Sequence, residues 1–382
     1  MASWRRLPVS PTHSVIRFEG HNIVPDRLNS NAGRQVLWWS RSGREYSRDR
    51  IVRHAFEQLG WQILDFTPLL SALGDWQAWL QRVRSPALVW VPCFRHKDAA
   101  AAVRWASARH VPVVFDPLIS AYDKQVFEQA RFAEDSAAAH RLLKWEAALM
   151  QRFDAVIADT HCHADFFRAS FGLPDSQVSI IPVGAEKDLF TPQPLAAARQ
   201  PVRVLFLGSF IGLQGPEVIA AAARLVPEVH WTFLGDGPLK PSCEQLCRDL
   251  TNVTFTPWVP YAELPAHISA ADILLGVFGA SQKAGRVIPN KVYQALATGR
   301  VVVTQESAAY PAELLQQPAA ESGVRFIAPG SPLALASAVR ELAGAPETLP
   351  ELGRHARKSY DRFFGPESVV ASLNEVITAL LR

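Results

Sequence analysis

The sequence predicts an α/β protein made of two doubly wound domains, each a parallel sheet with helices on both faces. The chain has 382 residues, which is more than one hydrophobic core usually accommodates. Short runs of β-branched and aromatic residues alternate with amphipathic stretches along the whole length, a pattern typical of parallel sheets covered by helices. A segment rich in Pro and Ala, without periodicity, separates two such series and predicts a linker at 190–201.

The first domain, residues 1–189, contains six runs that we predict to be strands. Helical patterns such as DRIVRHAFEQLG and AAAVRWASARH lie between them. The expected strands are at 35–40, 62–66, 87–92, 111–116, 155–159 and 178–183.

The second domain, residues 202–360, repeats the alternation. Its strands are expected at 202–208, 230–235, 252–259, 272–278 and 301–304, and its helices from Pro216, from Pro241, near ELPAHISAA and at 291–299. The last segment, 361–382, contains an amphipathic helix from Pro366, which we expect to pack across the junction between the domains.

Composition narrows the class of protein. With 48% hydrophobic and 20% charged residues, the chain is globular rather than disordered. The longest apolar run, ISAADILLGVFGA, is too short to span a bilayer, and no apolar segment of signal-peptide length follows MASWRRLPVS. We therefore expect a cytoplasmic protein. The net charge of +3 is unremarkable, and nucleic acid is not expected as a partner.

The N-terminal end is basic. Residues 1–50 carry nine Lys or Arg against four Asp or Glu, interleaved with Trp4, Trp38 and Trp39. This predicts weak peripheral contact of the first domain with an anionic membrane, at its inner face, although tryptophans in strands are more often part of a core.

Cysteine and histidine positions do not favour a metal site. Cys243 and Cys247 are four residues apart and most simply share one face of a helix, since no second Cys/His pair has ligand spacing. His161, Cys162 and His163 are adjacent, so their side chains point apart, and a polar helix start after Thr160 is the favoured interpretation. No metal is expected.

Two glycine-rich loops follow strands of the second domain, where ligands of doubly wound domains bind. The first, GSFIGLQG, begins at Gly208, and its glycines permit close approach of the backbone to a phosphate. A tight turn without a ligand explains them almost as well. The second, LGDGPL, places Gly235 and Gly237 on either side of Asp236, which alone is a common turn.

The most specific segment is KAGRVIPNKVYQALATGR at 283–300. A loop with Arg286 leads into a helix that carries Lys291 and Gln294. Cations at a helix start suit a diphosphate, and a polar side chain one turn later can reach a ribose. The alternative is a solvated basic helix start.

Taken together, these segments resemble the nucleotide-sugar domain of glycosyltransferase family 4. The succession VLFLGSFIGLQGPEVIAAA, FLGDGPL, NVTFTPWVPYAELPAHISAADILLGVFG and ATGRVVVT matches that family in order and spacing over about residues 200–345, and WWSRSGREYSRDRI matches more loosely. The resemblance implies a GT-B fold, in which two Rossmann-like domains face each other across a cleft. It also implies a nucleoside diphosphate sugar as donor, retention of anomeric configuration and no metal or other cofactor; the sequence has no Asp-x-Asp motif.

By this resemblance, the second domain holds the donor. The residues implied in donor binding are Gly208, Ser209, Gln214, Gly235, Asp236, Val259, Arg286, Val287, Ile288, Asn290, Lys291 and Gln294.

The sequence departs from the family pattern in the donor site. Ser209 and Gln214 stand where the family usually has an Arg and a Lys on the diphosphate, and Arg286 and Gln294 stand where it has two glutamates. We expect Arg286 and Lys291 to bind the diphosphate instead. The alternatives are that both are surface residues, or that Arg286 pairs with a carboxylate of the first domain and closes the cleft.

Candidate acceptor residues follow strands of the first domain. Asp116 and Asp123 are candidates to orient an acceptor hydroxyl, and with Arg286 and Lys291 they are the predicted catalytic residues. The loop SRSGREYSRD, which an ordinary polar loop explains equally well, offers the acceptor candidates Arg41, Glu45, Tyr46 and Arg48.

The function predicted from these features is transfer of a hexose-type sugar from a nucleoside diphosphate to a hydroxyl of a cell-envelope glycan or lipid-linked acceptor. Two alternatives use the same architecture. One is another enzyme class, such as a sugar-nucleotide epimerase or a phosphorylase, and the other is a catalytically inactive nucleotide-binding partner.

Overall fold

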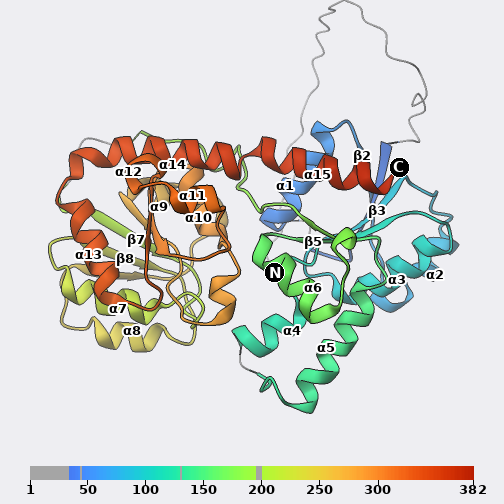
Figure 1. Cartoon of the computed structure of the whole chain (residues 1–382), viewed down its shortest axis with the longest axis horizontal. Helices are drawn as coiled ribbons and strands as arrows, with labels where there is room; N and C mark the ends of the chain where they lie inside the picture. The colour runs from blue at the N-terminus through green and yellow to red at the C-terminus, as the bar shows by residue number, and fades with distance from the viewer. Residues whose placement is uncertain (1–33, 44, 130, 195–199) are drawn as a thin grey trace, which may run out of the picture.

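Two six-stranded sheets, both entirely parallel, form the framework of the molecule. The computed structural model describes residues 34–43, 45–129, 131–194 and 200–382. The strand order is β2-β1-β3-β4-β5-β6 in the first sheet and β12-β11-β10-β7-β8-β9 in the second, and helices surround each sheet (Figure 1). The predicted fold class is therefore confirmed.

The first sheet contains all six predicted strands, most of them shorter by one to three residues. Strand β1 shows why they form, since Leu37 and Trp39 pack into one apolar cluster and Val36 and Trp38 into another on the opposite face. The strands are β1 (Gln35–Trp39), β2 (Gln62–Phe66), β3 (Leu88–Val91), β4 (Val113–Phe115), β5 (Ala155–Ala158) and β6 (Val178–Ile180), and the helices are α1 (Ser47–Gln58), α2 (Gly74–Leu80), α3 (His96–Ser107), α4 (Ala121–Asp123), α5 (Ala137–Met150) and α6 (His161–Phe171).

The second sheet contains the five predicted strands and a sixth, β12, that was not predicted. Helix α7 begins at Pro216 as predicted, and the proline lies in the first turn, where its missing N–H costs nothing. The strands are β7 (Arg203–Leu207), β8 (His230–Leu234), β9 (Val253–Thr256), β10 (Ile273–Leu275), β11 (Val301–Gln305) and β12 (Val324–Ile327), and the helices are α7 (Pro216–Leu225), α8 (Lys240–Leu246), α9 (Leu264–Ala270), α10 (Asn290–Ala297), α11 (Ala312–Gln316), α12 (Ala319–Ser322) and α13 (Pro332–Ala343).

The two domains share apolar contacts and the C-terminal helices. The segment that follows β6, residues 181–194, is here named the crossing segment. One cluster joins Cys93 and Leu118 of the first domain to Phe190 of this segment and to Tyr293 of the second domain. Helix α14 (Leu349–Phe363) packs on α10 and α12, and α15 (Pro366–Leu380) packs on α1. The two helices run along the same side of both domains (Figure 1). Part of the predicted linker, 195–199, lies outside the described residues.

A buried group of charged side chains lies beneath the start of α1. The guanidinium of Arg48 donates to Asp116 at 2.9 Å and to the Pro182 carbonyl at 2.6 Å. Asp49 is 1% exposed, and one of its oxygens accepts from the backbone and thiol of Cys93. Burial raises the pKa of Asp49 to about 7, and the nearby charge of Asp116 acts in the same direction, against the hydrogen bonds from Cys93.

Because the pKa of Asp49 is higher in the folded than in the unfolded chain, the folded state holds this proton more tightly, and stability falls as pH rises from about 4 to about 7. We therefore expect Asp49→Asn to gain unfolding free energy relative to the parent over that window, on the order of 1 kcal/mol per pH unit. Urea unfolding at about pH 5 and about pH 8 measures the difference. Glu244→Gln, an exposed carboxylate on α8, is the control. A difference for Asp49→Asn that is the same at both pH values would contradict this assignment.

Candidate active site

The two glycine loops of the second domain pack directly against each other. A Cβ on Gly235 would stand 2.1 Å from the carbonyl oxygen of Gly208, and a Cβ on Gly237 would stand 2.7 Å from the backbone nitrogen of Phe210. Gly235 also has φ +135°, which other residues rarely adopt. These two glycines therefore have a packing reason, independent of any ligand.

Gly208 is different, because polar side chains surround it. A Cβ at this position would lie 3.4 Å from both the Gln214 amide oxygen and the Lys291 ammonium. Both atoms are buried without a hydrogen-bond partner among the described residues. Lys291 is only 5% exposed, lies 4.1 Å from the ring centre of Phe206, and has a pKa well below its usual value because of burial. Unsatisfied buried polar atoms beside a glycine, at the start of α10, are typical of an anion-binding site.

The other predicted donor residues differ in their surroundings. Ser209 and Asp236 are exposed, and Asp236 accepts from the backbone of Gly237. Val259 and Val287 are half-buried, whereas Ile288 is buried.

Two of the predicted donor residues, Asn290 and Gln294, hydrogen-bond tyrosine side chains from other elements. Asn290 donates to the Tyr46 hydroxyl of the first domain at 3.2 Å. Gln294 is 3% exposed and donates to the Tyr261 hydroxyl at 3.2 Å. The structure thus brings Tyr46, a predicted acceptor residue, to the helix that carries Lys291.

Arg286 pairs with the first domain, as in the alternative interpretation of this residue. Its guanidinium lies 2.6 Å from Asp123, which is fully buried, and 4.3 Å from the ring centre of Phe166. Lys283, which was not among the predicted site residues, adds contacts of 3.2 Å to Asp123 and 2.5 Å to Glu128. These ion pairs join the second domain to the first.

The acceptor candidates are only partly brought together. Arg41 and Glu45 are exposed, and the backbone of Arg41 donates to Asp98. Arg48 and Asp116 are enclosed and pair with each other, so contact of either with an acceptor remains a prediction.

Sequence reasoning missed Glu186. Its carboxylate connects α1 to Tyr261 and, through Tyr261, to the predicted donor residue Gln294. One of its oxygens accepts from Arg50 at 2.8 Å, and the other accepts from Ser47 at 2.6 Å and from the Tyr261 hydroxyl at 2.8 Å. Tyr261 in turn accepts from Gln294. The signal was present in the sequence, because Glu186 follows the sixth strand of the first domain at the edge where ligands bind.

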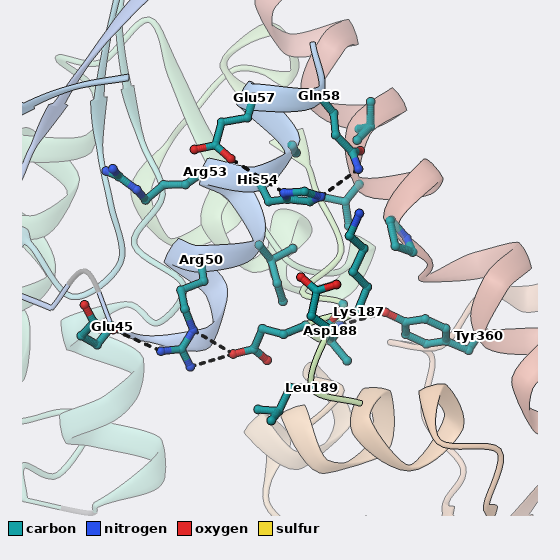
Figure 2. Close-up of a pocket in the computed structure, with 18 of the residues that line it drawn as sticks. Glu45, Arg50, Arg53, His54, Glu57, Gln58, Lys187, Asp188, Leu189 and Tyr360 are labelled. Atoms are coloured by element: carbon teal, nitrogen blue, oxygen red, sulfur yellow. Dashed lines mark hydrogen bonds and ion pairs between the residues drawn. The ribbon is translucent and has the colours of Figure 1, made fainter. Parts of the chain in front are cut away.

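A cavity of about 740 Å³ lies beside this network. It is lined by α1, residues 184–189 of the crossing segment, Tyr261 and the beginning of α15. Figure 2 shows Arg50 between Glu45 and the segment that carries Lys187 and Leu189. Among the predicted site residues, Glu45 alone lines this cavity.

The cysteine and histidine positions have the predicted structural roles. Helix α6 starts at His161, and Thr160 caps it by accepting from the backbone of His163. Cys243 and Cys247 are buried and free. The described residues include no group of three or more His, Cys, Asp or Glu side chains placed to hold a metal ion. One unforeseen pair is His163 with Asp159, whose side chains are 2.6 Å apart.

Two family models match the chain, one in each domain. Residues 27–184 match the model described as Glycosyl transferase 4-like domain, and residues 201–344 match Glycosyl transferases group 1.

Two curated relatives are glycosyltransferases. A GDP-mannose-dependent alpha-(1-6)-phosphatidylinositol monomannoside mannosyltransferase of Mycolicibacterium smegmatis is 30% identical over 28% of this chain and 32% of its own length. A D-inositol 3-phosphate glycosyltransferase of Segniliparus rotundus is 27% identical over 57% of this chain and 51% of its own length. The chain thus aligns with a third to a half of these relatives.

Solved structures share the architecture. HepE of Anabaena in complex with UDP has a TM-score of 0.65 and 16% identity, covering 90% of this chain and 99% of that one. Sucrose-phosphate synthase of Thermosynechococcus elongatus has a TM-score of 0.67 and 18% identity, covering 89% and 97%. At this identity the likeness concerns the fold, which is that of GT-B enzymes. From the two family models and this fold, the chain has the GT-B architecture and resembles the glycosyltransferases of family 4.

Proposed function

We propose that this enzyme transfers a hexose-type sugar, with retention of configuration, from a nucleoside diphosphate sugar to a hydroxyl of a cell-envelope glycan or lipid-linked acceptor. The observation that carries the donor assignment is the buried amine of Lys291 beside Gly208, which has no hydrogen-bond partner among the described residues. The relatives support it, since one is named for GDP-mannose and HepE structures contain UDP and UDP-glucose. The name of the same mannosyltransferase, which includes a phosphatidylinositol mannoside, supports a lipid-linked acceptor.

In this proposal, the second domain stabilises the leaving group. The diphosphate gains negative charge as the glycosidic bond breaks, and Lys291 at the start of α10 supplies a positive charge beside the helix dipole. The departing phosphate takes the proton of the acceptor hydroxyl, so no protein nucleophile and no metal are needed. The contribution of the chain is to hold the donor and the acceptor in a reactive orientation.

Arg286 can share this task only if its ion pair opens. Asp123 and a donor diphosphate would compete for the same guanidinium, which offers a planar pair of donors to either. Binding of the donor would then free one oxygen of Asp123, which is one of the two candidates to orient the acceptor hydroxyl, while Lys283 keeps its contact with the other oxygen. Arg286 could in this way pair with Asp123 in the free enzyme and bind the diphosphate when the donor is present.

We also propose that the reaction takes place on the cytoplasmic side of a membrane. The helices of the described residues all lack the combination of length and apolarity needed to cross a bilayer. A lipid-linked acceptor would therefore be reached from the surface.

The direct test is incubation with labelled UDP- and GDP-hexoses and a panel of hydroxyl acceptors, with the product anomer determined by NMR. Transfer or slow hydrolysis with retention is expected. Inversion would contradict the proposed stereochemistry, epimer formation would favour a different enzyme class, and binding without turnover would identify an inactive partner. Added chelator is expected to leave the rate unchanged if no metal participates.

Lys291→Met should weaken binding of a nucleoside diphosphate by about ten- to hundredfold while leaving nucleoside binding nearly unchanged, because it removes a charge-assisted contact to phosphate only. Burial lowers the pKa of Lys291, so diphosphate binding to the charged amine should take up a proton, and affinity should fall as pH rises. Calorimetry at several pH values in the parent and the variant measures both effects. The exposed Lys358→Met on α14 is the control, and equal losses for nucleoside and diphosphate would contradict the assignment.

Gln294→Ala should weaken nucleotide binding by roughly two- to tenfold if the amide also hydrogen-bonds the ribose. Inorganic pyrophosphate, which has no ribose, should bind with unchanged affinity. Because Gln294 also donates to Tyr261, Tyr261→Phe serves as a matched variant: it keeps the amide but removes this internal bond, together with the bond from Tyr261 to Glu186. Nucleotide affinity that is lost in Tyr261→Phe as much as in Gln294→Ala would assign the effect to the network rather than to a ribose contact.

Arg286→Ala and Asp123→Asn separate diphosphate binding from domain closure. If Arg286 binds phosphate, the first variant should lose about tenfold in diphosphate affinity, and the second should lose none, since it removes a competitor. Titration with nucleoside diphosphates gives the affinities, and small-angle scattering gives the domain arrangement. Unchanged affinity in Arg286→Ala, with the same expansion in both variants, would leave the ion pair with a structural role only.

A further inference from the structure

Half of the exposed large hydrophobic side chains of the described residues lie within one short segment. Six of the twelve are between positions 69 and 80, at 52–75% exposure. Helix α2, which carries three of them, lies at the end of the first domain farthest from the second domain (Figure 1). The six residues are Leu69, Leu70, Leu73, Trp76, Trp79 and Leu80, here named the apolar turn.

The fold of the first domain does not use these side chains. Helix α2 packs inward through two small residues, Gly74 and Ala78, both buried. A Cβ on Gly74 would lie 2.9 Å from the Trp39 ring, so the small residue is required for this close packing. The large residues of α2 therefore face away from the core, the reverse of the usual distribution.

The apolar turn is held in place by polar contacts behind it. Gln77 accepts from the Leu69 backbone and donates to the Thr67 carbonyl. Arg104 of α3 binds both oxygens of Asp75 at 2.8 Å and donates to the Ala72 carbonyl. A segment fixed in this way presents its apolar side chains in one arrangement and loses little freedom when it binds.

The charged residues around the apolar turn favour an anionic membrane as its binding partner. Asp75 is the single acidic residue between positions 67 and 84, and Arg104 neutralises it. Two exposed arginines, Arg82 and Arg84, follow the helix directly. Exposed Leu and Trp side chains next to basic residues are the combination that enters the headgroup region of an anionic bilayer.

We propose that the apolar turn, with Arg82 and Arg84, is the surface through which this enzyme docks on an anionic membrane. Membrane contact had been predicted from residues 1–50, but Trp38 and Trp39 are fully buried in the sheet, and Trp4 lies outside the described residues. The docking surface is instead in the segment that follows β2. The docking does not depend on the proposed reaction.

The apolar turn is linked to the loop that carries an acceptor candidate. The segment begins directly after Phe66, whose carbonyl accepts from the backbone of Ser40 at 3.0 Å. Ser40 opens the loop that carries Arg41, one of the acceptor candidates. Docking through the apolar turn would therefore bring that loop near the headgroups.

The test is co-sedimentation of the full chain with vesicles of phosphatidylcholine alone and of phosphatidylcholine mixed with phosphatidylglycerol, at low and high salt. The parent should bind the mixed vesicles and lose much of this binding at high salt. Trp76→Ser combined with Trp79→Ser should reduce the partition coefficient by about tenfold. Arg82→Glu combined with Arg84→Glu should reduce binding to the anionic vesicles at low salt.

A single-residue pair provides the matched control. Leu80→Ser and Leu333→Ser remove leucines of similar exposure, 70% and 73%, but Leu333 is on α13 of the second domain. Only Leu80→Ser should lose vesicle binding. Unchanged binding in the apolar-turn variants would overturn the proposal, and so would a dimer in light scattering that the same variants dissociate without any vesicle binding, because the surface would then bind a second copy. Turnover is not part of the readout, so failure of the proposed reaction does not affect the result.

Discussion

The buried carboxylate of Asp123 is the contact on which the arrangement of the two domains depends. A fully buried carboxylate is costly unless it is paired, and both cations that pair with it, Lys283 and Arg286, come from the other domain. The same closed arrangement allows Asn290 to reach Tyr46 and Tyr261 to reach Glu186. Opening the cleft would separate these pairs and expose Asp123 to water, where its charge needs no partner.

Lys291, which we propose to bind the donor diphosphate, differs from Asp123 because no opposite charge lies beside it among the described residues. Lys291 is also buried, yet apart from the Phe206 ring its amine has no hydrogen-bond partner among the described residues. An unpaired buried amine destabilises the fold, and such a cost is typical of a site that binds an anion. The chain therefore pairs the charges between its domains internally, whereas the amine of Lys291 is left for the diphosphate that we propose it binds.

Much of the fold was predictable because strands buried on both faces are continuous apolar runs, as in VLFL before Gly208. Strand β12 (Val324–Ile327) was missed because it is short and lies at the edge of the sheet. Only its first and last residues are buried, and Arg325 interrupts its apolar run. Helix α2 was missed because its large apolar residues face outward, so its pattern does not indicate a buried face.

The sequence could predict those parts of the candidate site that lie in loops at the carboxyl ends of strands. The loops at 208–215 and 283–291 were recognised from residue type and order, and Arg286 was correctly considered as a partner for a first-domain carboxylate. The pairing of Arg48 with Asp116 depends on how α1 enters the core, and the role of Glu186 depends on how the crossing segment approaches Tyr261. Neither geometry is encoded in local spacing.

The path of the C-terminal helices makes the two domains inseparable as modules. Helix α15 is the last element in sequence, yet Val369, Leu373 and Ile377 complete the apolar face of the first sheet around Trp38. A fragment ending at the crossing segment would leave that face open to water. Exchange of whole halves between related enzymes would therefore have to carry α15 along with the N-terminal half, in two separate pieces of the gene, to preserve a native core.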